Sequence, residues 1–260
     1  MRNIKLSIEY DGTNHSGWQV QRKPNIKSQK LKTQTKNQKF STIQNEIEKA
    51  LAKILQEKIR VIASGRTDSG VHAKAQIANF KTHTKLPAES IKNALNANLP
   101  DDIAISGAED IDTDFHARFS AKSKLYRYTV LNRSNRSPLA IKYSYFIRAP
   151  LNVSAMKQAA RVLLGRHDFK SFQATDKIER KSVRTIKKLS LQKKKDFIYM
   201  DVEADGFLYN MVRNIAGTLI DVGRGRIKPD DMKKILAARD RKKAGPAAPA
   251  KGLCLLKVNY

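Results

Sequence analysis

The first regular pattern along the chain is a strict alternation of apolar and polar residues from Ile4 to Tyr10, which predicts a strand buried on one face. After residue 41 the period changes to that of an amphipathic helix, and Ser41 and Gln44 fit a capping box at its start. By the same criteria the first half contains strands at 4–10, 60–64, 75–81 and 103–105 and helices that begin at Ser41 and Pro87. Its predicted order is β-α-β-β-α-β.

The second half repeats this order. It contains strands at 124–131, 182–191, 197–204 and 253–258, a helix capped by Asn152 and ended by Gly165, a helix over 207–222 and a short helix from Pro229. Two similar units explain a repeated order better than chance does. We therefore expect an α+β protein with two β-α-β-β-α-β halves, residues 1–112 and 113–260, whose antiparallel or mixed sheets are flanked by helices.

Composition changes this picture in one respect, which is charge. The 260 residues and their 40% hydrophobic content are sufficient for a real core, but 51 Lys and Arg oppose only 24 acids, giving a net charge of +27. Such an excess favours a polyanionic partner, either nucleic acid or an anionic membrane surface. No apolar run is long enough to span a bilayer and residues 1–10 lack a signal-peptide core, so we expect a cytoplasmic protein. The single Cys254 is expected to be a small buried hydrophobe.

The positive charge is concentrated in two segments. Gln21 to Phe40 contains seven Lys or Arg and no acid, and its polar composition predicts a mobile basic loop rather than a packed element. Lys177 to Lys195 contains nine Lys or Arg and one acid. Either segment alone fits a solvated surface, whereas the two together on this chain favour contact with nucleic acid. We expect a basic cleft between the halves.

Candidate chemistry lies on the loop between the strands at 60–64 and 75–81. Asp68 stands there between Gly65 and Gly70 and two residues from Arg66, whose guanidinium could hold the carboxylate ionised. An ionised carboxylate on such a loop can act as a nucleophile or a base. The same composition also fits an ordinary turn.

Five stretches carry a resemblance to a known family. They are Gly17-Trp18-Gln19, G-R-T-D-S-G-V-H-A at 65–73, F-H-A-R-F-S-A at 115–121, K-L-Y-R-Y at 124–128 and G-F-L-Y-N-M-V-R-N-I at 206–215. Together they resemble the tRNA pseudouridine synthase A family over nearly the whole chain. The basic segment Gln21–Phe40 departs from the family pattern as an apparent insertion, which bears on substrate engagement rather than on chemistry.

The resemblance implies a reaction and a set of site residues. A uridine already within tRNA, in the anticodon stem-loop at positions 38, 39 and 40, would be isomerised to pseudouridine, with Asp68 as the nucleophile or its equivalent. Arg66 and Arg213 would hold Asp68, and Tyr126 would stack on the flipped uracil and help to remove its proton. The resemblance does not decide whether Asp68 attacks the ribose or the uracil. The resemblance also implies a homodimer with tRNA as its partner, and the reaction requires neither cofactor nor metal.

Residue chemistry supports part of this assignment independently. Arg213 lies on an otherwise apolar predicted helix, where a buried charge requires a partner. Tyr126 lies among basic residues, as do side chains that stack on unpaired bases, although a core tyrosine fits the same pattern.

Two other functions remain open at this point. A non-catalytic basic RNA-binding protein would explain the charge but not the pairing of arginine and aspartate on a glycine-flanked loop. A metal-dependent nuclease could use Asp68, His72, Asp114 and His116, although their spacing has no metal-ligand pattern.

Overall fold

The computed structural model describes residues 1–19, 41–175 and 181–260. The basic segment Gln21–Phe40 and residues 177–180 of the second basic segment lie outside the described residues, so the expected mobile loop is not tested. None of the helices in the described part of the chain has the length and apolar character needed to cross a membrane.

The first half has the predicted order of elements. They are β1 (Arg2–Tyr10), α1 (Ile43–Leu55), β2 (Ile62–Ala63), β3 (His72–Thr82), α2 (Ala88–Asn96) and β4 (Ile103–Ile111), with a short 3₁₀ turn, η1 (Gly12–Asn14), after β1. The N-cap of α1 is Thr42 and not Ser41, because the Thr42 side chain accepts the hydrogen bond from the Asn45 amide.

The second half contains the predicted elements and two further strands. They are β5 (Ser123–Asn132), β6 (Tyr145–Ile147), α3 (Val153–Arg161), β7 (Gly165–Asp168), β8 (Val183–Lys194), β9 (Phe197–Ala204), α4 (Met211–Gly223), α5 (Asp231–Ala238) and β10 (Leu253–Asn259), with 3₁₀ turns η2 (Lys170–Phe172), η3 (Arg241–Lys243) and η4 (Ala250–Gly252). β6 and β7 were not expected. Gly165 therefore begins a strand and does not end α3, which stops four residues earlier at Arg161.

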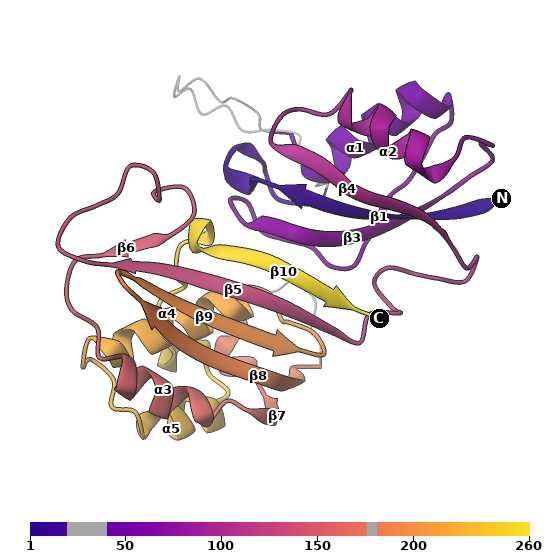
Figure 1. Cartoon of the computed structure of the whole chain (residues 1–260). Helices are drawn as coiled ribbons and strands as arrows, with labels where there is room; N and C mark the ends of the chain where they lie inside the picture. The colour runs from indigo at the N-terminus through magenta and orange to yellow at the C-terminus, as the bar shows by residue number, and fades with distance from the viewer. Residues whose placement is uncertain (20–40, 176–180) are drawn as a thin grey trace, which may run out of the picture.

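The strands of both halves form one continuous sheet rather than two separate ones. Along the sheet the order is β4-β1-β3-β10-β5-β9-β8-β7, with β2 on β3 and β6 on β5. The last strand, β10, joins the halves because it pairs parallel with β3 and antiparallel with β5 (Figure 1). The α+β class and the mixed sheet are confirmed, and the C-terminal strand is placed beside the N-terminal half.

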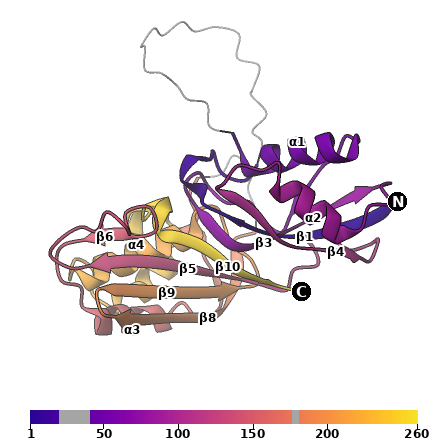
Figure 2. The same ribbon diagram turned by 45° about the horizontal axis from the view of Figure 1, so that its top comes forward.

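Helices cover the strands of each half separately. α1 and α2 lie over the β1, β3 and β4 region, whereas α3 and α4 lie with β5, β8 and β9 (Figure 2). α5 packs against β7 and α3. In β1 the alternation predicted from the sequence buries Ile4, Leu6 and Ile8 completely. In α4 every residue is buried except Arg213. A helix enclosed in this way holds the side chain of Arg213 in a fixed position.

Candidate active site

The loop between β2 and β3 that carries Asp68 is fixed on both sides by hydrogen bonds. The Thr67 carbonyl accepts from the Trp18 amide at 3.0 Å, and the Thr67 hydroxyl pairs with the buried hydroxyl of Tyr10 at 2.8 Å. Gln76 of β3 donates to the Gly65 carbonyl at 2.9 Å. These contacts hold the backbone around Asp68 against the end of β1, so the carboxylate has a defined direction.

Glycines allow the loop to pack this closely. Gly17 has φ of +84°, and a Cβ there would lie 2.6 Å from the Thr67 carbonyl oxygen. Gly70 has φ of +77° and turns the chain into β3. The structure thus gives the Gly17-Trp18 motif a physical role, since it forms the support on which the Asp68 loop rests. Gly65 has no positive φ, and a Cβ placed on it would make an ordinary contact with the side chain of Lys124.

Asp68 forms an ion pair with Arg213, which lies 145 residues further along the chain. Nη1 of Arg213 is 3.1 Å from Oδ2 of Asp68 and also donates to Oδ1 of Asn210 at 3.0 Å, while Nε donates to the Ala248 carbonyl at 2.8 Å. The side chains of Arg213 and Asp68 are 19% and 27% exposed. The pair is therefore oriented by the fold yet open to a ligand.

The position of Arg213 depends on the segment that follows α5. Gly217, one turn after Arg213 on α4, has no room for a Cβ because that atom would overlap the carbonyl oxygen of Pro246. This close approach lets the Ala248 amide donate to the Arg213 carbonyl at 3.0 Å, while the Ala248 carbonyl accepts from Nε. Ala248 thereby holds both the backbone and the side chain of Arg213 before any ligand binds.

Arg66 does not make the contact expected from its position in the sequence. Its side chain is exposed, whereas Thr67 beside it is buried, and the ion pairs of the described residues join Asp68 to Arg213 and not to Arg66. The side chain of Thr67 is hydrogen-bonded to the buried Tyr10 hydroxyl, while that of Arg66 beside it faces solvent. Arg66 is thus free to meet a substrate rather than to hold Asp68.

Tyr126 lies on β5, is 7% exposed and meets Phe207 edge to face with ring centroids 5.2 Å apart. Burial raises the pKa of Tyr126 strongly, and the negative charge of Asp68 nearby raises it further. Among the described residues none is hydrogen-bonded to the Tyr126 hydroxyl, which is not fully enclosed. At neutral pH this side chain is a hydrogen-bond donor next to Asp68 and not a proton acceptor.

Sequence reasoning missed several residues that shape the site. Asn210, which precedes α4 in a left-handed conformation, accepts a hydrogen bond from Arg213, and Phe207 forms the wall behind Tyr126. A polar residue at a helix start was a signal for Asn210. The contact between Thr67 and Tyr10 had no such signal, because it joins segments that only the fold brings together.

The four residues considered for a metal-dependent nuclease are not gathered in one place. The Nδ1 atom of His72 lies 3.0 Å from Asp11, whereas Nδ1 of His116 accepts from the amides of Arg118 and Phe119. Within residues 1–19, 41–175 and 181–260, no three His, Cys, Asp or Glu side chains are arranged to hold a metal ion.

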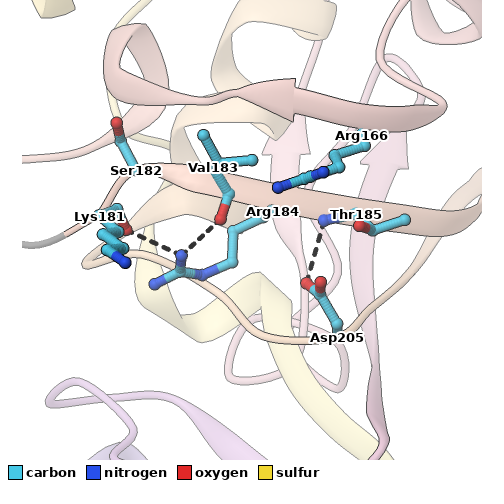
Figure 3. A pocket seen from close by; sticks show the side chains of 7 residues that line it. All are labelled: Arg166, Lys181, Ser182, Val183, Arg184, Thr185 and Asp205. Atoms are coloured by element: carbon cyan, nitrogen blue, oxygen red, sulfur yellow. Dashed lines mark hydrogen bonds between the residues drawn. The ribbon is translucent and has the colours of Figure 1, made fainter.

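Two surface hollows lie apart from Asp68. One, at the β7–β8 edge, is lined by Arg166, Lys181, Arg184 and Asp205; Arg184 donates to the carbonyls of Lys181 and Val183 (Figure 3). The other lies beside β1 and β3 and is lined by several acids, among them Asp11 and Asp102. Neither hollow is lined by Asp68 or Arg213. The basic hollow lies within the second half, whereas the hollow lined by residues of both halves is the one with several acids.

A single carboxylate held by an arginine beside a protonated tyrosine, on a strongly basic α+β chain, defines an enzyme site suited to nucleic acid. The family model described as tRNA pseudouridine synthase matches residues 6–120 and 159–260. The chain belongs to the tRNA pseudouridine synthase family, whose members are isomerases.

Named relatives match over the full length. A tRNA pseudouridine synthase A of Thermoanaerobacter sp. (strain X514) is 46% identical and a tRNA pseudouridine synthase A 2 of Clostridium perfringens (strain 13 / Type A) is 46% identical, each with 100% of both chains covered. A chain in the solved structure titled "Crystal Structure of a Cbf5-Nop10-Gar1 Complex" is 11% identical with a TM-score of 0.35, covering 82% of this chain and 44% of that one. That likeness is too weak to define the fold.

Proposed function

We propose that this enzyme isomerises uridine to pseudouridine in the anticodon stem-loop of tRNA, at positions 38, 39 and 40. The observation that carries the proposal is the ion pair of Asp68 with Arg213, which leaves Oδ1 of the carboxylate without a hydrogen bond from any described residue. The full-length similarity to proteins named tRNA pseudouridine synthase A supports the substrate. The positions within the tRNA rest on the motifs at 65–73 and 206–215 that resemble this family.

In this reaction the bond between the ribose and N1 of uracil breaks, and a bond from the ribose to C5 of the same base forms. The proton lost from C5 is balanced by one gained at N1, so there is no net oxidation. Asp68 would act as the nucleophile through Oδ1, while Arg213 holds Oδ2 in place. Because Arg213 is held by Ala248 and Asn210, little reorganisation is needed when substrate arrives.

The role proposed for Tyr126 is to position the uracil. Its ring is supported by Phe207, and its hydroxyl, kept protonated by the raised pKa, can donate to the base or ribose. A uridine must leave its stack to reach such a site, as in other enzymes that act on bases. Arg66 would bind the substrate from the exposed edge of the Asp68 loop.

The test is to incubate the enzyme with unmodified tRNA transcripts in the presence of a chelator and to map pseudouridine by position. We expect pseudouridine at 38, 39 or 40 and intact strands. Pseudouridine only at other positions would refute the proposed specificity. Tight binding without any product would indicate an RNA-binding protein, and strand cleavage that needs a divalent metal would indicate a nuclease.

The resemblance also leads us to propose that the enzyme works as a homodimer in the cytoplasm. Sedimentation equilibrium at micromolar concentration measures the assembly directly. A mass of twice 29.3 kDa would support the dimer, and a mass of 29.3 kDa would contradict it.

A further inference from the structure

Lys124 lies beside the loop that carries Asp68, and the reaction proposed above does not use it. It precedes Tyr126 by two residues on β5, so both side chains project from the same face of the sheet. A Cβ placed on Gly65 would be 3.5 Å from Cε and 3.7 Å from Nζ of Lys124. The ammonium group therefore rests against the backbone that leads to Arg66 and Asp68.

Within the described part of the chain, the charge of Lys124 has no partner. Its side chain is half-buried, and no described residue forms an ion pair with it or accepts a hydrogen bond from it. Burial lowers the pKa of Lys124, and the neighbouring positive charge of Arg118 lowers it further. A half-buried cation that faces another cation is unfavourable in the free protein. Such an arrangement is suited to an anion that arrives from outside.

The neighbouring turn adds to the positive edge and is rigid. The Ala117 amide donates to Asn79 at 2.9 Å, and the Ala117 carbonyl accepts from the hydroxyl of Tyr260 at 2.8 Å. This turn presents Arg118 above the ring of Phe119, which is 75% exposed. Lys124, Arg118 and Arg66 thus form a cationic edge next to Asp68, with an exposed aromatic ring beside it.

We propose that Lys124 binds a backbone phosphate of the RNA strand next to the reacting uridine, and so fixes that nucleotide over Asp68. This inference rests on the proposed function, because it assumes that the uracil occupies the space at Tyr126. Two residues along a strand span about 7 Å, so a nucleoside held between Tyr126 and Asp68 would have its phosphates within reach of this edge. A lysine ammonium commonly binds phosphates as a point charge, and the phosphate oxygens accept its hydrogen bonds.

The first test removes the charge but keeps the length of the side chain. Lys124→Met should weaken binding of the anticodon stem-loop about 10- to 100-fold and reduce the slope of log K against log salt by about 0.7 to 0.9. Lys257→Met is the matched control, because Lys257 is exposed and pairs with Leu125, which places it on the opposite face. Lys124→Arg should restore most of the binding. Equal binding by Lys124→Met and Lys257→Met would overturn the proposal.

Stability separates a binding role from a structural one. Loss of an unpaired half-buried charge should leave the Tm of Lys124→Met equal to or above that of the wild type. A clear fall in Tm that accounts for the weaker binding would make Lys124 structural.

The second test locates the phosphate. Neutral methylphosphonate is placed at one linkage at a time around the target uridine, and binding is measured with both proteins. At one position the neutral linkage should weaken binding by the wild type by the same factor as Lys124→Met does. The same linkage should leave binding by Lys124→Met unchanged. Losses that are equal in the two proteins at every position would contradict the contact. Because this cycle measures binding alone, it remains decisive even if the wild type forms no pseudouridine at 38–40 and the proposed function fails.

Discussion

Asp68 and Arg213 show how far residue chemistry leads without a fold. The sequence predicted that Arg213, on an apolar helix, needs a buried partner, but only the family resemblance named Asp68 as that partner. Proximity along the chain suggested Arg66, which in the structure is exposed and apart from the ion pair. The deciding contact, between Thr67 and Tyr10, joins residues 57 positions apart and has no local signature.

Removing the guanidinium should impair catalysis more than folding. We expect Arg213→Met to lower kcat at least about 100-fold, since a preorganised donor to the reacting group is lost. The lost hydrogen bonds to Ala248 and Asn210 should cost about 1–3 kcal/mol of unfolding free energy. Single-turnover kinetics and urea unfolding measure the two effects. Normal activity per folded molecule would show that Arg213 is only structural.

The raised pKa of Tyr126 leads to a prediction about pH. Because burial keeps the phenol protonated through neutral and mildly alkaline pH, Tyr126 should contribute no limb to the pH profile of kcat/KM below about pH 10. Tyr126→Phe should therefore change the height of the profile and not its shape. It should also bind tRNA better than Tyr126→Leu, which lacks the ring. A limb near neutral pH that is absent in Tyr126→Phe would mean that the tyrosine acts as the base.

At the level of elements, long strands and helices could be predicted and short polar ones could not. β9 was predicted at its observed bounds, because apolar and polar residues alternate along it. β7 consists of Gly-Arg-His-Asp, which has no apolar period, and it exists because it pairs with β8. β6 has three residues and depends on the edge of β5 in the same way. Tertiary pairing decides such segments.

The close packing of α4 against the Pro246–Ala248 segment is open to a direct test. Gly217→Ala should displace this segment, lower the unfolding free energy by about 1–3 kcal/mol and loosen Arg213, with a matching fall in kcat. Gly107→Ala is the control, because a Cβ in β4 would meet Ser7 at an ordinary 3.6 Å. Urea unfolding and turnover are compared for both. Equal effects of the two changes would show that the contact at Gly217 is unimportant.

At the level of the whole molecule, the sequence predicted two similar halves but not the single sheet that joins them. The repeated order of elements indicated similar halves, and the boundary at residue 112 stays a prediction. The pairing of β10 with β3 makes one sheet of them. A second link is the segment before β6: Tyr143 donates to Asp11 at 2.9 Å, and His72 lies 3.0 Å from the Lys142 carbonyl. Neither link follows from periodicity.

The link at Asp11 should be sensitive to acid. Burial alone would raise the pKa of Asp11, but hydrogen bonds from Thr13 and Tyr143 lower it. A lowered folded pKa stabilises the protein above the unfolded value of about 3.9, and this stabilisation is lost as the pH falls through the folded pKa.

Tyr143→Phe should therefore reduce the unfolding free energy by about 0.5 kcal/mol at pH 7, a small value because Tyr143 is half exposed. The difference from the wild type should shrink towards pH 2. Tyr145→Phe, whose hydroxyl has no hydrogen bond among the described residues, is the control. A difference for Tyr143→Phe that is independent of pH would contradict the charge-assisted link.

The measurement that tests the central claim most directly compares Asp68→Asn with the wild type on one tRNA transcript. Both are assayed for equilibrium binding and for pseudouridine formed in a single turnover with enzyme in excess. Asparagine keeps the volume of the side chain but is no nucleophile, so binding should stay within a few-fold while product falls below detection. Product at more than about a hundredth of the wild-type rate would contradict the assignment of Asp68 as the residue that carries the reaction.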